Sequence, residues 1–130
     1  MARQGEMNIL EMPLMFVWYD MIDIGEKPEE YREIKPYWEK RLLDYKSLVK
    51  YYEENKAELH IKRLLFGHRP VIENVCEAFP ADYTHIRFRR GYTKTTMLFE
   101  IKSISFGIGN PKWGAPKNKP VFIIKLGKRV

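Results

Sequence analysis

Residues 95–108 read Thr-Thr-Met-Leu-Phe-Glu-Ile-Lys-Ser-Ile-Ser-Phe-Gly-Ile, and this stretch decides the fold. Met97, Phe99 and Ile101 are apolar at every second position, which is typical of a strand with one buried face. The alternation then slips by one residue and resumes at Ile104. Such a slip predicts a β-bulge or a bend. A long bent strand in a chain of 130 residues favours a sheet that closes into a small barrel.

Strands are also predicted on both sides of this segment. Residues 83–90 alternate between an apolar face and a basic face, and residues 91–94 have the composition of a turn. Residues 110–119 are rich in Pro, Gly and Lys, which is typical of a loop. Residues 121–126, which are apolar except for Lys125, predict a strand that is buried on both faces. The C-terminal part of the chain is therefore expected to be β-structure.

The N-terminal part is predicted to contain one short helix and one strand. Apolar residues at helical spacing predict a helix over residues 16–24, and Gly25 is placed to end it. The alternation that follows predicts a strand over residues 29–34. Residues 1–8 are polar and are expected to be loosely held.

A helical insertion is predicted between these two parts, over about residues 36–79. Pro36 fits the first position of a helix, and apolar residues recur at steps of three and four up to about residue 57. This pattern predicts an amphipathic helix with a charged outer face of Glu, Lys and Arg. Two further short helices are predicted over residues 57–66 and 70–78. The whole pattern predicts a single α+β domain over residues 1–130, a partly closed β-barrel with flanking helices.

The net charge favours a negatively charged partner such as nucleic acid, and the cysteine count favours a reducing compartment. There are 23 Lys and Arg against 17 Asp and Glu, a formal net charge of +6, which raises the encounter rate with nucleic acid. Cys76 is the only cysteine, so no internal disulfide can form. No segment approaches the roughly 20 apolar residues of a membrane span, and the N-terminal residues lack the pattern of a signal peptide. A cytoplasmic protein without a membrane partner is expected.

Residues 25–32 read Gly-Glu-Lys-Pro-Glu-Glu-Tyr-Arg, and in them a turn precedes Lys27, Glu30 and Arg32. Gly25 allows a sharp turn, Lys27 then lies at the mouth of the strand, and Glu30 and Arg32 project from one strand face about 7 Å apart. A carboxylate accepts from an exocyclic amine, and a guanidinium binds a phosphate or a base edge. The alternative is a solvated strand with a Glu–Arg ion pair worth at most ~1 kcal/mol.

This segment has the form G-x-K-x-x-E-x-R, and with it the chain resembles the ASCH family, whose members are similar to PUA domains. The flanking residues 18–22 and 31–38 and the loop 107–116 also resemble that family. The resemblance covers roughly residues 12–42 and 83–128, and the helical stretch between them looks like an insertion. It implies a small PUA-like β-barrel, the ASCH fold, whose pocket is lined by the motif and recognises a nucleobase or nucleotide in RNA.

Other cationic and aromatic residues are candidates for contact with RNA. Arg87 and Arg89 share a strand face, Tyr92 and Lys94 lie at the following turn, and Trp113 lies in the Pro/Gly/Lys loop. Phosphates require positive charge and bases stack on flat rings, so this mixture suits single-stranded nucleic acid. The alternative is a solvated strand and a loop whose Trp packs on the barrel. Because His60 and His68 lack a partner at metal-ligand spacing and there is one cysteine, no metal ion is expected. No cofactor is expected either, because the sequence has no Gly-rich loop of the kind that binds phosphates.

Three functions remain open at this stage. The first is binding of RNA, a nucleotide or a nucleoside. The second is hydrolysis, because one branch of ASCH-like proteins removes the acyl group of N4-acetylcytidine with a Lys, a Thr three residues later and a distant Glu, and some relatives are proposed ribonucleases. Lys27 matches the Lys, but Glu30 occupies the position of the Thr. If the chain is an enzyme, Lys27 and Glu30 are the candidates for its catalytic residues.

The third function is a scaffold that pairs with another protein through the helical insertion. Tyr51, Tyr52 and Leu65 are candidates for an exposed apolar patch there. Weak association of two copies of the chain into a homodimer is a further expectation.

Overall fold

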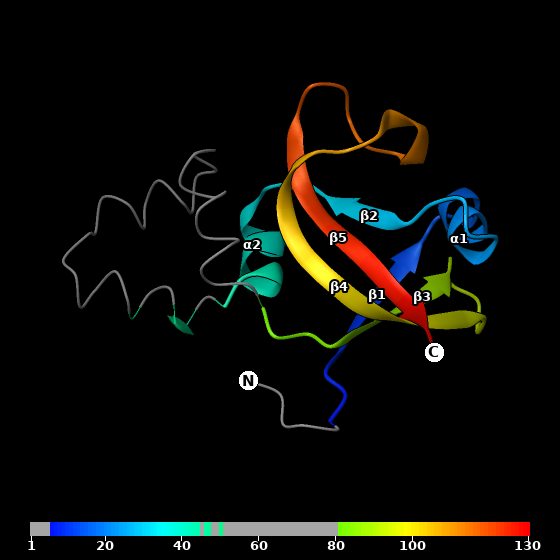
Figure 1. Ribbon diagram of the computed structural model, residues 1–130, viewed down its shortest axis with the longest axis horizontal. Helices are drawn as coiled ribbons and strands as arrows, with labels where there is room; N and C mark the ends of the chain where they lie inside the picture. The colour runs from blue at the N-terminus through cyan, green and yellow to red at the C-terminus, as the bar shows by residue number, and fades with distance from the viewer. Residues whose placement is uncertain (1–5, 45, 48–49, 51–80) are drawn as a thin grey trace.

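Five strands form one mixed sheet that curls into a half-barrel (Figure 1). The computed structural model describes residues 6–44, 46–47, 50 and 81–130. In this part of the chain the strand order is β1-β3-β4-β5-β2, with β1 parallel to β3 and the other neighbours antiparallel. The sheet and two helices confirm the predicted α+β class. The strands are β1 (Ile9–Leu14), β2 (Glu29–Arg32), β3 (His85–Arg90), β4 (Thr96–Ile108) and β5 (Pro120–Arg129).

The longest of these strands, β4, makes the bend that the sequence predicts. Its first residues, 96–100, pair with β3, whereas most of residues 101–108 pair with β5. The register with β5 shifts between Phe99 and Ile101 and again between Ile101 and Ser103. These shifts fall where the apolar alternation slips, so the predicted bulge is confirmed. The bend thereby lets β4 pair with β3 at its beginning and with β5 over the rest of its length.

Apolar residues are buried on both faces of β5 over residues 121–124, as the apolar run there predicts, whereas Lys125 and residues 127–129 are exposed. One face joins the main core, which contains Phe122 and Ile124 together with buried residues of β1, β3, β4 and both helices. The other face forms a second cluster of Tyr31, Ala115, Val121 and Ile123. The loop between β4 and β5, which contains the 3₁₀ helix η1 (Pro111–Trp113), covers this second cluster.

Two helices, α1 (Phe16–Asp23) and α2 (Pro36–Leu42), lie on opposite sides of the curled sheet in Figure 1. Both begin where the sequence predicts, and α1 ends one residue before its predicted end. Tyr19 and Ile22 of α1 and Leu42 of α2 are buried in the main core. Among the described residues, no helix has the length and apolar composition needed to cross a lipid bilayer.

Strand β1 is missing from the sequence-based prediction. Leu10, Met12 and Leu14 alternate as buried residues, but Pro13 interrupts the pattern and argues against a strand. The structure tolerates this proline because β1 lies at the edge of the sheet. The Gly91 amide donates to the Leu14 carbonyl (2.7 Å), so the backbone groups of the preceding proline face away from β3.

The prediction of one continuous helix from Pro36 to about residue 57 is wrong at Leu43. That residue is extended (φ −115°, ψ 152°) and buried, so α2 ends at Leu42. The Leu42 carbonyl accepts instead from the Ala81 amide (3.1 Å). Similarly, the strand predicted over residues 29–34 ends at Arg32.

A second difference in α2 concerns its charged face, which was predicted to be exposed. Glu39 is only 2% exposed and is buried together with Leu42. Most of the predicted insertion, residues 36–79, lies outside the described residues. The predicted helices over residues 57–66 and 70–78 and the proposed scaffold patch lie there too.

Candidate functional site

A Schellman motif ends α1 and directs the chain toward β2. Gly25 has φ +83°, a conformation that residues with a side chain rarely adopt. Its amide donates to the Ile22 carbonyl (3.0 Å), and the Glu26 amide donates to the Met21 carbonyl (2.9 Å). The predicted role of Gly25 is therefore confirmed, and the charged residues of the motif follow directly after it.

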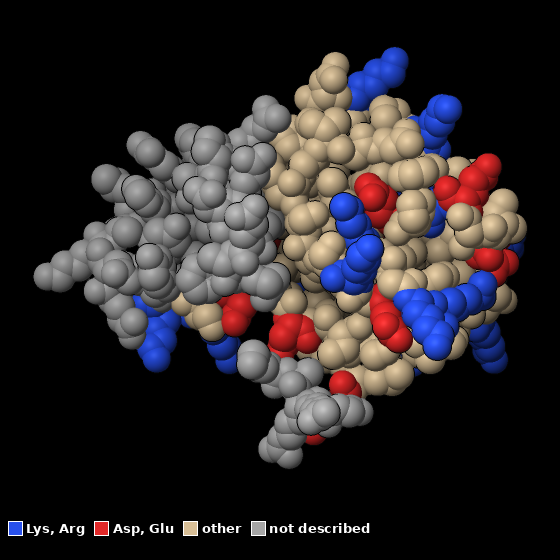
Figure 2. All heavy atoms as spheres, viewed as in Figure 1, with Lys and Arg blue, Asp and Glu red and all other residues tan. Residues whose placement is uncertain are grey.

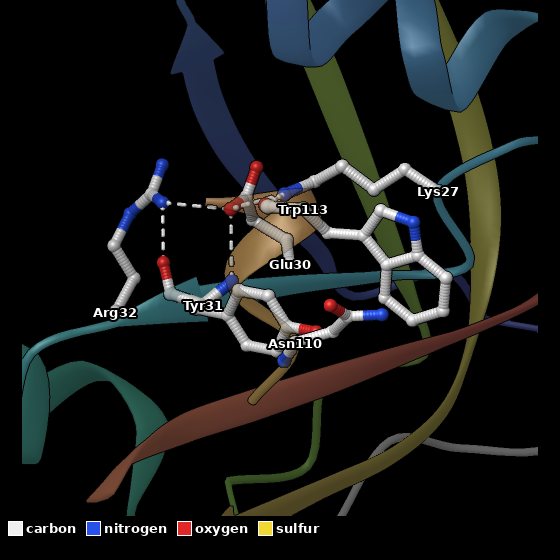
Figure 3. A network of polar contacts seen from close by, with 6 residues as sticks. All are labelled: Lys27, Glu30, Tyr31, Arg32, Asn110 and Trp113. Carbon is white, nitrogen blue, oxygen red and sulfur yellow. Dashed lines mark hydrogen bonds and ion pairs between the residues drawn. The ribbon is translucent and has the colours of Figure 1, made fainter. Parts of the chain in front are cut away.

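Lys27 is buried in a network of polar contacts (Figure 3), and its side chain is 0% exposed. Its Nζ donates to Glu30 Oε1 (3.3 Å) and to the backbone carbonyl of Trp113. The same nitrogen lies 4.9 Å from the ring centre of Trp18 and 5.0 Å from that of Tyr31. Burial lowers the pKa of Lys27 from its ordinary value, and the Glu30 carboxylate opposes this shift. Lys27 thus links the start of β2 to the loop between β4 and β5.

The two carboxylate oxygens of Glu30 have unequal surroundings. Oε1 accepts from the Tyr31 amide (2.8 Å) as well as from Lys27, and lies 3.4 Å from Nη1 of Arg32. Oε2 is buried and has no hydrogen-bond partner in the described part of the chain. An unpaired buried acceptor is costly, more so when it is charged. Oε2 therefore keeps an unused capacity to accept a hydrogen bond.

Arg32 approaches the same carboxylate from the opposite side to Lys27, as Figure 3 shows. Its Nη1 donates to the Tyr31 carbonyl (2.6 Å), and its guanidinium lies 5.2 Å from the ring centre of Trp38. Burial lowers the pKa of Arg32 and Glu30 opposes this, but a guanidinium stays charged because its ordinary pKa lies far above neutral pH. Within the described residues its Nε and Nη2 make no hydrogen bond. The side chain is 19% exposed and lines both of the pockets described below.

The opposite face of β2 is held by the loop between β4 and β5. The Asn110 amide donates to the Tyr31 hydroxyl (3.0 Å), and burial raises the pKa of this phenol above its ordinary value. A Cβ on Gly109 would lie only 2.6 Å from the Tyr31 ring and from the Ala115 side chain, so only glycine fits there. The loop is thus fixed against β2, which also fixes the carbonyl that accepts from Lys27.

Two pockets share Arg32 in their walls. The smaller has a volume of about 250 Å³ and the larger about 530 Å³. Ligand sites usually measure roughly 300–1,000 Å³, so the larger pocket falls within this range and the smaller one lies slightly below it. The smaller pocket is lined by Trp18, Glu30, Arg32 and Trp113, among others. The larger is lined by Arg32, Glu33, Lys35, Trp38 and Lys119, among others.

The structure therefore brings together part of the predicted site. Glu30 and Arg32 share one strand face and line a pocket, as the alternation of residues 29–34 predicts. Lys27 contacts Glu30 but lines neither of these two pockets. Trp113 is half-buried, packs against the second cluster and also lines the smaller pocket.

The arginines of β3 lie elsewhere, outside both pockets. Arg87 Nη1 donates to both carboxylate oxygens of Glu11 (3.0 and 2.9 Å). Arg89 Nη1 donates to the Thr93 carbonyl (3.2 Å). Both project from the face of β3 opposite to its buried residues.

Tyr92 and Lys94 are exposed in the turn between β3 and β4, and they also line neither pocket. On the face of the molecule drawn in Figure 2, basic and acidic side chains are interspersed rather than gathered into one basic field. The net positive charge alone therefore does not locate a binding surface on that face.

Sequence reasoning did not assign three of the aromatic and basic residues that line the pockets. Trp18, Lys35 and Trp38 lie close to the motif in the chain, and this proximity is the signal that was available. Lys119 is one of the loop lysines that the sequence offers beside Trp113, and the path of the loop brings it to the wall of the larger pocket.

No group of three or more His, Cys, Asp or Glu side chains in residues 6–44 and 81–130 is placed to hold a metal ion. Comparisons with protein-family models, with curated proteins and with solved structures gave no match to this chain, so the motif and the geometry of the site carry the functional argument.

Proposed function

We propose that the chain binds RNA or a nucleotide through an ASCH-type, PUA-like barrel, with a nucleobase in the smaller pocket. The proposal rests on one observation above all. Glu30 lines a pocket together with Trp18 and Trp113, and its Oε2 has no hydrogen-bond partner among the described residues. A carboxylate supplies directional hydrogen bonding and the indole rings supply flat apolar surface, which are the two needs of a base.

The free oxygen of Glu30 defines the class of base. Cytosine, adenine and guanine each carry an exocyclic amine that can donate to it. Uracil offers only a ring N–H flanked by two carbonyl oxygens, which a carboxylate repels. A base with an amino group is therefore the favoured occupant.

The surroundings of Lys27 favour binding over hydrolysis. Its Nζ is already engaged by Glu30 and by the Trp113 carbonyl, and the side chain lines neither pocket. A general base must come within about 2.6–3.2 Å of the proton it removes. Of the two predicted catalytic residues, only Glu30 lines a pocket.

The binding proposal predicts the effect of Arg32→Gln. Removing the guanidinium should weaken binding of a short single-stranded RNA at low salt by roughly 10- to 100-fold, because hydrogen bonds to charged groups contribute about 1.5–3 kcal/mol. Fluorescence anisotropy with a labelled oligonucleotide measures the affinity, and thermal unfolding monitors the fold. Lys27 is a poor probe for this purpose because it is buried.

Arg129→Gln is the matched control, because it removes the same charge from an exposed side chain paired with Asp23. The control should bind with nearly the affinity of the unaltered protein. Equal affinity of the Arg32→Gln variant and this control would remove the basis of the proposal.

Residues on and after β3 are proposed as additional contacts for a longer RNA. Arg87, Arg89, Tyr92 and Lys94 combine cations with an aromatic ring that is fully exposed. They would add affinity that depends on salt but not on sequence.

Hydrolysis of a modified nucleoside or of RNA remains the second candidate, favoured by the lowered pKa of Lys27 next to Glu30. The engaged ammonium leads us to expect no acetate from N4-acetylcytidine and no shortening of labelled RNA, even at high protein concentration. Turnover that disappears in a Glu30→Gln variant would establish the hydrolase instead.

A further inference from the structure

The larger pocket gathers positive charge from separate parts of the chain. Arg32 comes from β2, Lys35 from the segment before α2, and Lys119 from the end of the loop before β5. One carboxylate, that of Glu33, also lines the pocket, and it lies 3.9 Å from the Lys35 ammonium. Three cations and one anion leave a formal charge of +2 in the wall.

Arg32 connects this charged pocket to the smaller one. It lines both, and its Nε and Nη2 are without hydrogen bonds among the described residues. The Trp38 ring, which also lines the larger pocket, stacks near the guanidinium and holds it in place. A ligand that spans the two pockets would therefore contact Arg32 in both, beside N–H groups that no described residue uses.

We propose that the larger pocket binds a phosphate group of the nucleotide whose base occupies the smaller pocket. This inference rests on the proposed function, and it adds that the protein selects phosphorylated ligands over free nucleosides. A phosphate monoester carries about −1.5 to −2 charges at pH 7, which matches the +2 of the wall. The fixed guanidinium of Arg32 binds its oxygens as a fork, and the ammonium groups of Lys35 and Lys119 add charge from flexible stems.

The phosphate can belong to a mononucleotide or an RNA end, or it can be an internal phosphodiester of RNA. Both present oxygens to the same cations, but a diester carries only one negative charge. The wall charge favours the terminal monoester, and the experiment separates the two sources.

Titration calorimetry with cytidine, adenosine and guanosine, and with their 5′- and 3′-monophosphates and dinucleoside monophosphates, tests the inference. In the unaltered protein, at least one monophosphate should bind about tenfold or more tightly than its nucleoside. In the double variant Lys35→Gln/Lys119→Gln, this preference should fall to within about twofold while nucleoside affinity is retained. The double variant Lys102→Gln/Lys128→Gln loses the same charge from exposed residues outside both pockets and should keep the preference.

The outcomes separate this inference from the proposed function. Equal affinity for nucleosides and their phosphates would overturn the phosphate site and leave the base pocket standing. A preference that survives in the Lys35/Lys119 variant would overturn it as well. No binding of any of these ligands would overturn both proposals. Tighter binding of a monophosphate than of the dinucleoside monophosphate assigns the site to a terminal phosphate, and the reverse assigns it to an internal one.

Discussion

Replacing Lys27 by methionine is expected to lower the free energy of unfolding by about 3–5 kcal/mol, the usual cost of removing one partner from a buried ion pair. Methionine retains most of the apolar stem, so the lost quantity is the ammonium. Without it, the Trp113 carbonyl loses its donor and the Glu30 carboxylate keeps only Arg32 and the Tyr31 amide as partners. Urea unfolding with linear extrapolation measures the change.

Lys102→Met provides the matched control, since Lys102 is an exposed residue of β4. Its unfolding free energy should change by no more than about 0.5 kcal/mol. Combining Lys27→Met with Glu30→Gln should cost less than the sum of the two single changes, because the double variant no longer buries an under-compensated carboxylate. A loss for Lys27→Met as small as that of the control would mean that the network contributes little to stability.

These contacts assign different tasks to the three charges of the motif. Lys27 is enclosed and joins β2 to the loop, whereas Arg32 retains free donors at two pockets. Glu30 takes part in both, with one oxygen in the network and the other unpartnered. If a change at Lys27 abolished binding, the cause would therefore be mainly a loss of folding. A loss of binding on changing Arg32 would instead report a lost contact with the ligand.

Features that depend on neighbouring residues in the chain were predictable from the sequence. The slip before Ile104 marked the irregular register of β4, and Gly25 marked the end of α1. Alternation placed Glu30 and Arg32 on one strand face. Each of these signals is local, because side-chain direction in a strand and backbone freedom at glycine need no tertiary information.

Features that depend on distant contacts were not predictable. Pro13 is compatible with a strand only because β1 lies at the sheet edge, which the topology determines. Leu43 ends α2 because it is extended and buried, although its residue type suits a helix. The burial of Lys27 likewise depends on a loop more than 80 residues away.

Glu39→Gln is expected to stabilise the protein above pH 7 and to leave it nearly unchanged at pH 4. Burial raises the pKa of Glu39 from 4.5 to about 7, and one of its carboxylate oxygens is buried without a hydrogen-bond partner in the described part of the chain. The folded state therefore favours the protonated acid. The stability that this group contributes is complete below pH 4.5 and is lost as the pH rises to about 7. The loss amounts to roughly 3 kcal/mol, since one pKa unit corresponds to about 1.4 kcal/mol.

Glutamine keeps the shape of this side chain without a titratable proton, so it should remove that pH dependence. At pH 8 the variant should exceed the unaltered protein in unfolding free energy by up to roughly 3 kcal/mol, measured by urea unfolding at several values between pH 4 and 8. Glu33→Gln, a change at an exposed carboxylate, is the matched control and should leave the profile unaltered. Parallel profiles for the Glu39→Gln variant and the unaltered protein would show that Glu39 is ionised in the folded state at neutral pH. The side chain would then need a partner or solvent contact that compensates its charge, because an ionised carboxylate without either is too costly to keep buried.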